Sequence, residues 1–261
     1  MITEVFDPHS PALIRPEQAI PAETLALAAR FELPCFIVFF SDKLLGALVE
    51  SGRLEVLDSG LTIGTAASRN PIYRIRGTRI GVALSGIGAP AAAAVVEELY
   101  AQFHPRRFLV FGSCGALVPI PEGRLILPTA ACRDEGTSYH YAPAAEEIAV
   151  PGAGKLAQVL DRLGVDYVTG KTWTTDAFYR ETEANLRRRV EQGCVCVEME
   201  CSALQAVCGY LGVDFYPFLY SADSLHGAWD RRILGALEKD SRLRFFALAE
   251  AIAERLAEDE A

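Results

Sequence analysis

The chain has 261 residues, of which 51% are hydrophobic and 23% are charged, so it can bury a large core and is not a disordered chain. Its formal net charge of −9, without any long basic run, argues against electrostatically driven binding to nucleic acid or to an anionic membrane surface. It has neither a basic leader before an apolar core nor an apolar stretch of membrane-spanning length, so we expect a cytoplasmic protein that binds neither partner.

Hydrophobic runs and helical repeats alternate along the chain. In order, the pattern predicts a strand at 35–40, a helix through 44–49, strands at 73–75 and 79–84, a helix at 91–103, strands at 108–111 and 124–131, a helix at 154–163, a strand at 167–172, a helix at 183–191, a strand at 194–197, a helix at 203–211, a strand at 215–220 and a helix at 233–257. No repeat, low-complexity segment or linker interrupts this order. We therefore expect one domain, residues 1–261, with a mainly β core flanked by helices.

The seven cysteines are odd in number and lie mostly in apolar runs, which is typical of buried, reduced thiols in a cytosolic protein. Cys194 and Cys196 alternate along a predicted strand and so share one face. No second pair of cysteine or histidine residues completes a zinc site. We therefore expect no metal ion and no resident cofactor.

Two acids stand between an apolar strand and an amphipathic helix. Glu198 and Glu200 follow the run 194–197 and precede a helical repeat that Gly212 ends. The carboxyl end of a strand in a βαβ unit is where open α/β sheets bind their ligands. Because carboxylates are costly to bury, a polyhydroxyl ligand would explain the pair, but acids that merely open a helix and complement its dipole would explain it equally well.

Two glycine-bearing turns are candidate ligand contacts. The segment 85–88, with Gly86, follows a strand and opens a helix, where backbone N–H groups attract anions. It lacks the third glycine of the dinucleotide fingerprint and the lysine of a P-loop. The segment 112–115 adds the Ser113 hydroxyl, which could hold an oxyanion or a sugar hydroxyl. The alternative is that these glycines serve only tight backbone geometry.

Five motifs occur along the chain in one order: Ser85–Pro90, Gly112–Gly115, Glu135–Pro143, Asp176–Tyr179 and Val197–Glu200. Together they resemble the nucleoside phosphorylase and nucleosidase superfamily, nearest to its uridine-phosphorylase-like branch. The resemblance runs from about residue 81 to the carboxyl terminus. It implies a three-layer α/β/α fold around a mixed, partly barrel-like sheet. It also implies a homodimer or a hexamer in which a neighbouring subunit completes each site.

Members of this superfamily cleave the N-glycosidic bond of a nucleoside through a ribosyl cation-like transition state, with phosphate or water as nucleophile. The resemblance implies that Glu200 binds the ribose 2′-hydroxyl and that Met199 packs against the sugar, with Glu198 supporting them. Phe178 matches the aromatic residue that stacks on the base. Ser113 matches the hydroxyl residue that contacts phosphate and ribose in the phosphorolytic members.

Asp223 follows the predicted strand 215–220. The purine-cleaving branches that the chain resembles carry an aspartate here, which acts as general acid toward N7 of the leaving base. A buried carboxyl can have its pKa raised for that task. The alternative is an Asx turn or a helix cap. The uracil-reading Gln-x-Arg pair of uridine phosphorylases is missing, with Thr182 and Ala184 at those positions, which favours a purine or an unusual base.

The chain departs from the phosphorolytic pattern where phosphate is held. The stretch 39–44 lacks the glycine and the arginine of the usual phosphate loop, and Val110 stands where a second arginine is expected. Phosphate needs several donors and positive charge, which Ser113 alone does not supply. Lys43, or an arginine such as Arg69 from a neighbouring subunit, could add charge, but the sequence establishes neither.

Three hypotheses follow. The first is a nucleoside-cleaving enzyme that uses phosphate as co-substrate. The second is a phosphate-independent nucleosidase, which the missing arginines favour. The third is a non-catalytic nucleoside-binding protein, which would not explain the acid at Asp223.

Overall fold

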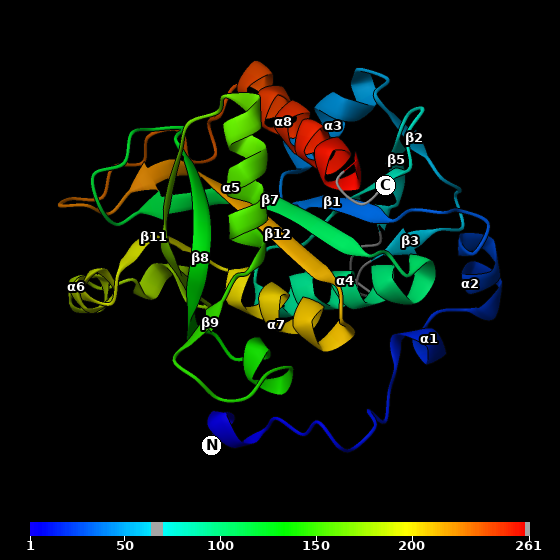
Figure 1. The fold of residues 1–261 in the computed structure, drawn as a ribbon, viewed down its shortest axis with the longest axis horizontal. Helices are drawn as coiled ribbons and strands as arrows, with labels where there is room; N and C mark the ends of the chain where they lie inside the picture. The colour runs from blue at the N-terminus through cyan, green and yellow to red at the C-terminus, as the bar shows by residue number, and fades with distance from the viewer. Residues whose placement is uncertain (64–69, 259–261) are drawn as a thin grey trace.

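A long mixed β-sheet runs through the protein and is covered by helices on both faces (Figure 1). The computed structural model describes residues 1–63 and 70–258. The strands are β1 (Cys35–Phe39), β2 (Leu54–Val56), β3 (Thr62–Ile63), β4 (Asn70–Pro71), β5 (Tyr73–Ile75), β6 (Ile80–Leu84), β7 (Arg107–Ala116), β8 (Leu125–Asp134), β9 (Glu147–Ala149), β10 (Tyr167–Thr175), β11 (Cys194–Glu198) and β12 (Asp214–Ser224). The helices are α1 (Pro16–Ala19), α2 (Ala22–Ala28), α3 (Asp42–Glu50), α4 (Ala89–Phe103), α5 (Gly152–Leu163), α6 (Glu183–Glu191), α7 (Cys201–Leu211) and α8 (Lys239–Glu258), with short 3₁₀ turns η1 (Ile2–Glu4), η2 (Thr137–His140) and η3 (Phe178–Arg180).

The sheet closes on itself at one end. Its strand order is β11-β10-β8-β12-β7-β1-β6-β5-β2, and β11 also pairs with β7. Five strands therefore form a closed barrel, in which β12 and β8, and also β11 and β7, are antiparallel while the other neighbours are parallel. This arrangement confirms the predicted α/β class with a mixed, partly barrel-like sheet.

Both faces of the open part of the sheet are buried. Along β1, Phe36 and Val38 pack into a cluster with α4 and α7, whereas Ile37 and Phe39 pack into a second cluster with α3, α5 and α8. Side chains alternate between the two faces of a strand, so a strand covered on both faces reads as a continuous apolar run. Figure 1 shows α3 and α8 on one face and α4 and α7 on the other, which gives the predicted three layers.

The barrel strands extend further at their carboxyl ends than their apolar runs predict. β7 continues through the glycine turn predicted at 112–115, and β12 continues beyond Tyr220. These residues have low intrinsic strand propensity, but the two strand ends pair with each other, and Gly115 and Ala116 also pair with β11, which supplies the hydrogen bonds that hold them extended. Ser113 and Asp223, expected in turns after their strands, therefore lie within β7 and β12.

Gly115 lies at the seam where the barrel closes. A Cβ atom there would lie 2.5 Å from Cδ1 of Leu225 and 3.1 Å from Cγ1 of Val197, so only glycine fits without displacing a neighbour. Gly115 pairs with Val197 of β11 on one side and with Asp223 of β12 on the other. The close approach brings the Glu198 segment and the Asp223 strand to the same end of β7.

The last helix begins later than predicted. Helical spacing predicts a helix at 233–257, but α8 starts at Lys239, because the chain turns at Arg232 and Gly235, both with positive φ.

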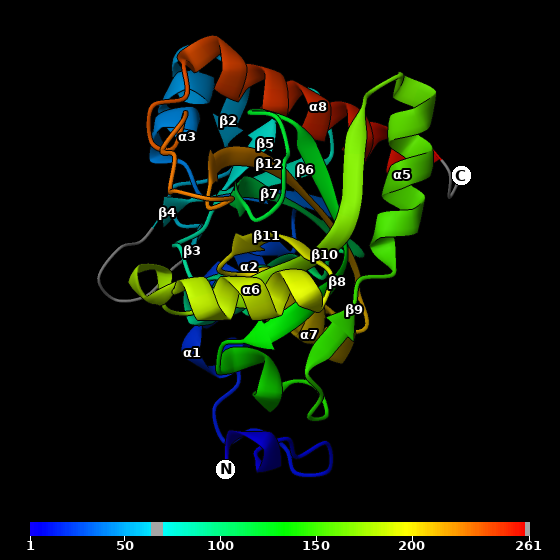
Figure 2. The ribbon, with the colours of Figure 1, turned by 90° about the vertical axis from the view of Figure 1, so that its left-hand side faces the viewer.

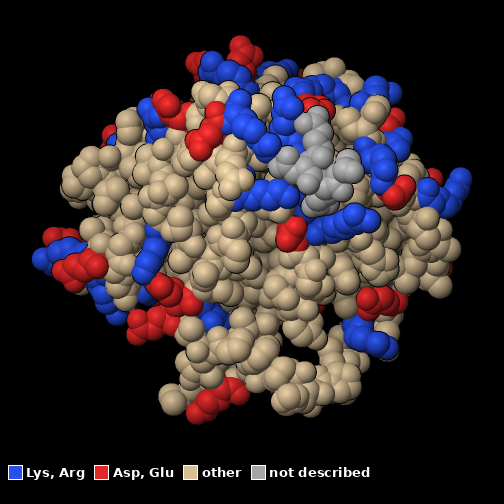
Figure 3. Space-filling view, in the orientation of Figure 1, with Lys and Arg blue, Asp and Glu red and all other residues tan. Residues whose placement is uncertain are grey.

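On the face shown in Figure 3, basic side chains gather in the upper half with acidic ones among them. Ion pairs in this region connect α8 to its surroundings, Lys239 with Glu50 of α3 at 2.8 Å among them. None of the described helices combines the length and apolarity needed to cross a membrane.

Candidate active site

A cavity of about 380 Å³ lies at the carboxyl ends of β7, β11 and β12. Its lining includes six residues that the sequence singled out: Ser113, Phe178, Glu198, Met199, Glu200 and Asp223. These residues come from segments up to 110 positions apart, and the barrel closure brings them together. Gly86 is exposed and does not line the cavity, whereas its neighbour Ile87 does.

Glu198 is fully committed to internal hydrogen bonds. Its Oε1 accepts from the hydroxyls of Thr174 at 2.6 Å and Thr172 at 3.2 Å, and its Oε2 accepts from the backbone N–H groups of Glu200 at 2.7 Å and Cys201 at 2.6 Å. These bonds join β10 to the first turn of α7, whose N–H groups have no helical partner. Glu198 thus fixes the backbone that carries Glu200.

Glu200 is the carboxyl group that the cavity leaves available. The side chain is 9% exposed, and its Oε1 accepts a 2.6 Å hydrogen bond from the N–H of Gly88 at the start of α4. Burial, with the Glu198 charge as a second cause, raises the pKa of Glu200 to about 8. The turn at 85–88 therefore acts through a backbone N–H that orients this carboxyl group.

Asp223 is held by an indole on the segment that follows its strand. Trp229 Nε1–H donates to Asp223 Oδ2 at 3.0 Å, although the Trp229 ring is largely exposed. Burial raises the pKa of Asp223, and the Trp229 bond and the Arg232 charge oppose that shift. A buried carboxyl with a raised pKa and one fixed oxygen is suited to donate a proton from the other oxygen.

Phe178 and Glu181 belong to one short turn beside the cavity. Phe178 begins η3 and Glu181 directly follows it. Residues three apart in a 3₁₀ turn lie on the same side, and both of these line the cavity. Burial, and secondarily the Asp223 charge, raises the pKa of Glu181 to about 7. Sequence reasoning missed Glu181, although its spacing from Phe178 was a usable signal.

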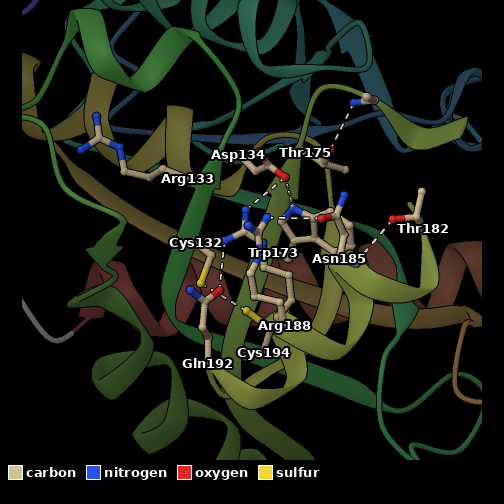
Figure 4. Close-up of polar contacts among 12 residues, drawn as sticks. Cys132, Arg133, Asp134, Trp173, Thr175, Thr182, Asn185, Arg188, Gln192 and Cys194 are labelled. Carbon is tan, nitrogen blue, oxygen red and sulfur yellow. Dashed lines mark hydrogen bonds and ion pairs between the residues drawn. The ribbon is translucent and has the colours of Figure 1, made fainter. Parts of the chain in front are cut away.

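A polar network anchors this turn to the barrel (Figure 4). Asp134 at the end of β8 accepts from Trp173 Nε1 at 2.9 Å and pairs with Arg189 of α6 at 3.1 Å. Thr182 caps α6 by accepting from the Asn185 N–H at 3.4 Å. Figure 2 shows α6 lying across the barrel end, next to β11. The network holds α6, and with it the segment that carries the cavity-lining turn.

The stretch 39–44, where a phosphate loop is expected, supplies no arginine to the cavity wall around Ser113. Phe40, in the expected phosphate-loop stretch, packs so closely on Gly112 that a Cβ there would lie 3.1 Å from its ring. Lys43 donates to the Gly235 carbonyl at 3.3 Å and does not line the cavity. Arg69 lies outside the described residues.

Two further cavity residues lie in elements that the sequence predicts but were not singled out as site residues. Tyr220 of β12 lies beside Ser113 in the strand register, and Arg242 comes from the first turn of α8. No motif marks either residue, because their place depends on how α8 packs. Within 1–63 and 70–258, no group of three or more His, Cys, Asp or Glu residues is placed to hold a metal ion.

Comparison with known proteins gives the same family that the motifs resemble. The chain is 31% identical to the DeoD-type purine nucleoside phosphorylase of Alkaliphilus metalliredigens, over 58% of this chain and 66% of the relative. It is 40% identical to the uridine phosphorylase of Thermococcus kodakarensis, over 41% of this chain and 39% of the relative. The chain thus spans less than two thirds of the length of these two relatives.

A solved structure shares the fold. The AMP nucleosidase from Bacteroides thetaiotaomicron VPI-5482 superposes with a TM-score of 0.68 at 20% identity, covering 94% of this chain and 99% of that one. The family model described as the phosphorylase superfamily matches residues 26–257. The chain therefore belongs to the phosphorylase superfamily.

Proposed function

We propose that this protein cleaves the N-glycosidic bond of a purine nucleoside and releases the free base. One observation carries the proposal: a single cavity joins a buried carboxyl at the end of β12, a second at the start of α7 and an aromatic ring on η3. These are Asp223, Glu200 and Phe178, from three segments distant in sequence. Their chemistry suits an acid for the leaving base, a sugar ligand and a stacking platform.

The reaction assigns each group one task. As the bond between C1′ and the base nitrogen breaks, its electron pair goes to the purine, and Asp223 donates a proton to N7. Positive charge grows on the ribose ring, and the Glu200 carboxylate on the 2′-hydroxyl stabilises that charge in the transition state. The nucleophile then forms the new bond at C1′.

Phosphate is the first candidate nucleophile, because Ser113, Tyr220 and Arg242 supply hydroxyl and guanidinium donors on one wall. Water is the second candidate. Among the described residues that line the cavity, four carry carboxyl groups and one carries a guanidinium, an acidic balance that disfavours a dianion.

A panel of purine and pyrimidine nucleosides, incubated with and without phosphate, tests the proposal. Base release that rises with phosphate, together with a ribose phosphate product, would establish phosphorolysis. Release of free ribose at a rate indifferent to phosphate would establish hydrolysis. Tight binding without release would contradict both and leave a binding protein.

The position of Glu181 favours a substrate whose purine base presents an N–H donor at its edge. No hydrogen bond or ion pair engages its carboxyl group in the part of the chain that the structure describes, and its side chain shares a turn with Phe178. A base stacked on Phe178 would direct an edge toward Glu181. An ionised carboxylate accepts from N1–H of hypoxanthine or guanine, whereas N1 of adenine is an acceptor.

Glu181→Gln should therefore shift base preference. The amide can donate to N1 of adenine and accept from its amino group, so the ratio of kcat/KM for inosine to that for adenosine should fall about tenfold or more. Glu183→Gln is the matched control, because Glu183 is exposed at the start of α6. An unchanged ratio in Glu181→Gln would remove this residue from base recognition.

We place the reaction in the cytoplasm, within nucleoside catabolism or salvage, in a homo-oligomer. All seven cysteines are buried and none of them forms a disulfide, which suits a reducing compartment. Sedimentation of the purified protein would test the assembly.

A further inference from the structure

Among the described residues that line the cavity, Arg242 is the one cation, and the other charged side chains are carboxyl groups. It lies in the first turn of α8, and its guanidinium donates to the Leu237 carbonyl at the preceding turn. No carboxylate pairs with it in the described part of the chain, in contrast to Arg53, which pairs with Glu250 of α8. A guanidinium that lines a cavity without a carboxylate partner is free to bind an anion.

Two hydroxyl groups accompany Arg242. Tyr220 and Ser113 are register partners on the neighbouring parallel strands β12 and β7, so their side chains lie next to one another. Burial raises the pKa of Tyr220, while the Arg242 charge and the Ser113 side chain act in the opposite direction. Each of them lines the cavity.

Aromatic contacts of α8 with its neighbours fix the position of Arg242. Phe245, one turn further along α8, stacks on Tyr220 with ring centroids 4.2 Å apart and planes inclined by 12°. The side chain of Phe246 packs at the same time in the core against Phe39 of β1, with ring centroids 6.1 Å apart. The two aromatic contacts hold the first turns of α8 against the wall that carries the hydroxyls.

We propose that Arg242, with the Ser113 and Tyr220 hydroxyls, forms a phosphoryl-binding subsite built from α8, β7 and β12. The guanidinium presents paired N–H donors that match phosphate oxygens, and the hydroxyls add further donors. The subsite lies beside the acid, because Ser113 and Tyr220 precede the register partners Gly115 and Asp223 on the same two strands. In this protein α8 therefore supplies the guanidinium that the stretch 39–44 lacks.

The phosphoryl group has two sources, inorganic phosphate that attacks C1′ or a phosphate carried by the substrate itself. The inference rests on the proposed function for its place in the reaction, but anion binding is measured without turnover. Titration of inorganic phosphate into the full-length protein by calorimetry gives that reading. Arg242→Met keeps the side-chain length and removes the charge. Arg244→Met is the matched control, since Arg244 lies two residues further along α8, is exposed, and donates to the Ser241 hydroxyl at 2.8 Å.

Phosphate affinity should fall at least tenfold in Arg242→Met, stay within twofold of wild type in Arg244→Met and be partly retained in Arg242→Lys. Unfolding temperatures measured without phosphate verify that each variant is folded. Equal phosphate affinity in wild type and Arg242→Met, or no phosphate binding by the wild type at any accessible concentration together with no preference for a nucleotide, overturns the subsite.

Base release distinguishes the two sources. If inorganic phosphate is the ligand, nucleoside cleavage saturates with phosphate, and Arg242→Met raises the KM for phosphate at least tenfold. If the substrate carries the group, a nucleoside monophosphate is cleaved faster than its nucleoside without added phosphate, and Arg242→Met abolishes that preference. Charge-dependent phosphate binding without any base release would retain the subsite and reject the proposed reaction.

Discussion

Asp223→Asn should lower kcat for purine nucleosides by about 10²–10⁴-fold while changing KM little. The amide keeps the shape of the side chain and can still interact with the Trp229 indole, which lies 3.0 Å from Oδ2 in the wild type. It cannot transfer a proton to N7, so the purine must leave as an anion. Steady-state kinetics on inosine or guanosine measures the loss.

A substrate that needs no protonation separates this role from a structural one. An N7-methylated purine nucleoside already carries positive charge on its base, so Asp223→Asn should cleave it at a rate close to wild type. Asp214→Asn is the matched control on the same strand, because Asp214 lies exposed at the opposite end of β12. If the methylated and unmethylated substrates lose rate equally in Asp223→Asn, Asp223 is not the acid.

Glu200→Gln should lower kcat/KM for ribonucleosides by roughly 10²–10³-fold, because it removes the negative charge that opposes the ribosyl cation. The amide oxygen can still accept from the Gly88 N–H, so the side chain keeps its position. The loss should be smaller for 2′-deoxyribonucleosides, since these substrates lack the hydroxyl that we propose Glu200 binds. Equal losses for the two sugars would contradict the proposed contact.

The pH dependence gives a second measurement of Glu200. Its pKa of about 8 means that the free protein carries a protonated Glu200 at lower pH, so kcat/KM of the wild type should rise as pH increases toward 8. Glu200→Gln should lack this rise.

Because the folded-state pKa is raised, ionisation of Glu200 costs folding stability as pH rises from the unfolded pKa toward 8. Thermal unfolding at pH 8 should therefore show the variant at least as stable as wild type, which separates lost activity from lost folding.

Elements such as β1 and α6 could be predicted because their signals are local. The apolar run at 35–40 and the helical repeat at 183–191 match β1 and α6 nearly residue for residue. Strands buried on both faces and helices buried on one leave different periodicities in the sequence. The carboxyl halves of β7 and β12 could not be predicted in this way, because Gly112 to Gly115 and Ser221 to Ser224 are extended by barrel pairing rather than by propensity.

The candidate site could likewise be predicted only where its signals are local in the sequence. Glu200, Asp223 and Phe178 were identified from motifs of adjacent residues, and the structure places all three in one cavity. The division of labour between Glu198 and Glu200 could not be read from their spacing. It depends on Thr172, Thr174 and the N–H of Gly88, which come from other strands and turns.

The sequence by itself therefore determined the α/β class, the order of the elements and the motif residues for sugar and base, since each depends on neighbours in the chain. Only the tertiary structure decided which of Glu198 and Glu200 is available to a ligand, that Glu181 lines the same cavity as Phe178 and that Arg242 reaches the wall of Ser113. The physical reason is that burial and charge at the cavity depend on packing between distant segments. Barrel closure at Gly115 and the stacking of α8 on Tyr220 bring those segments together.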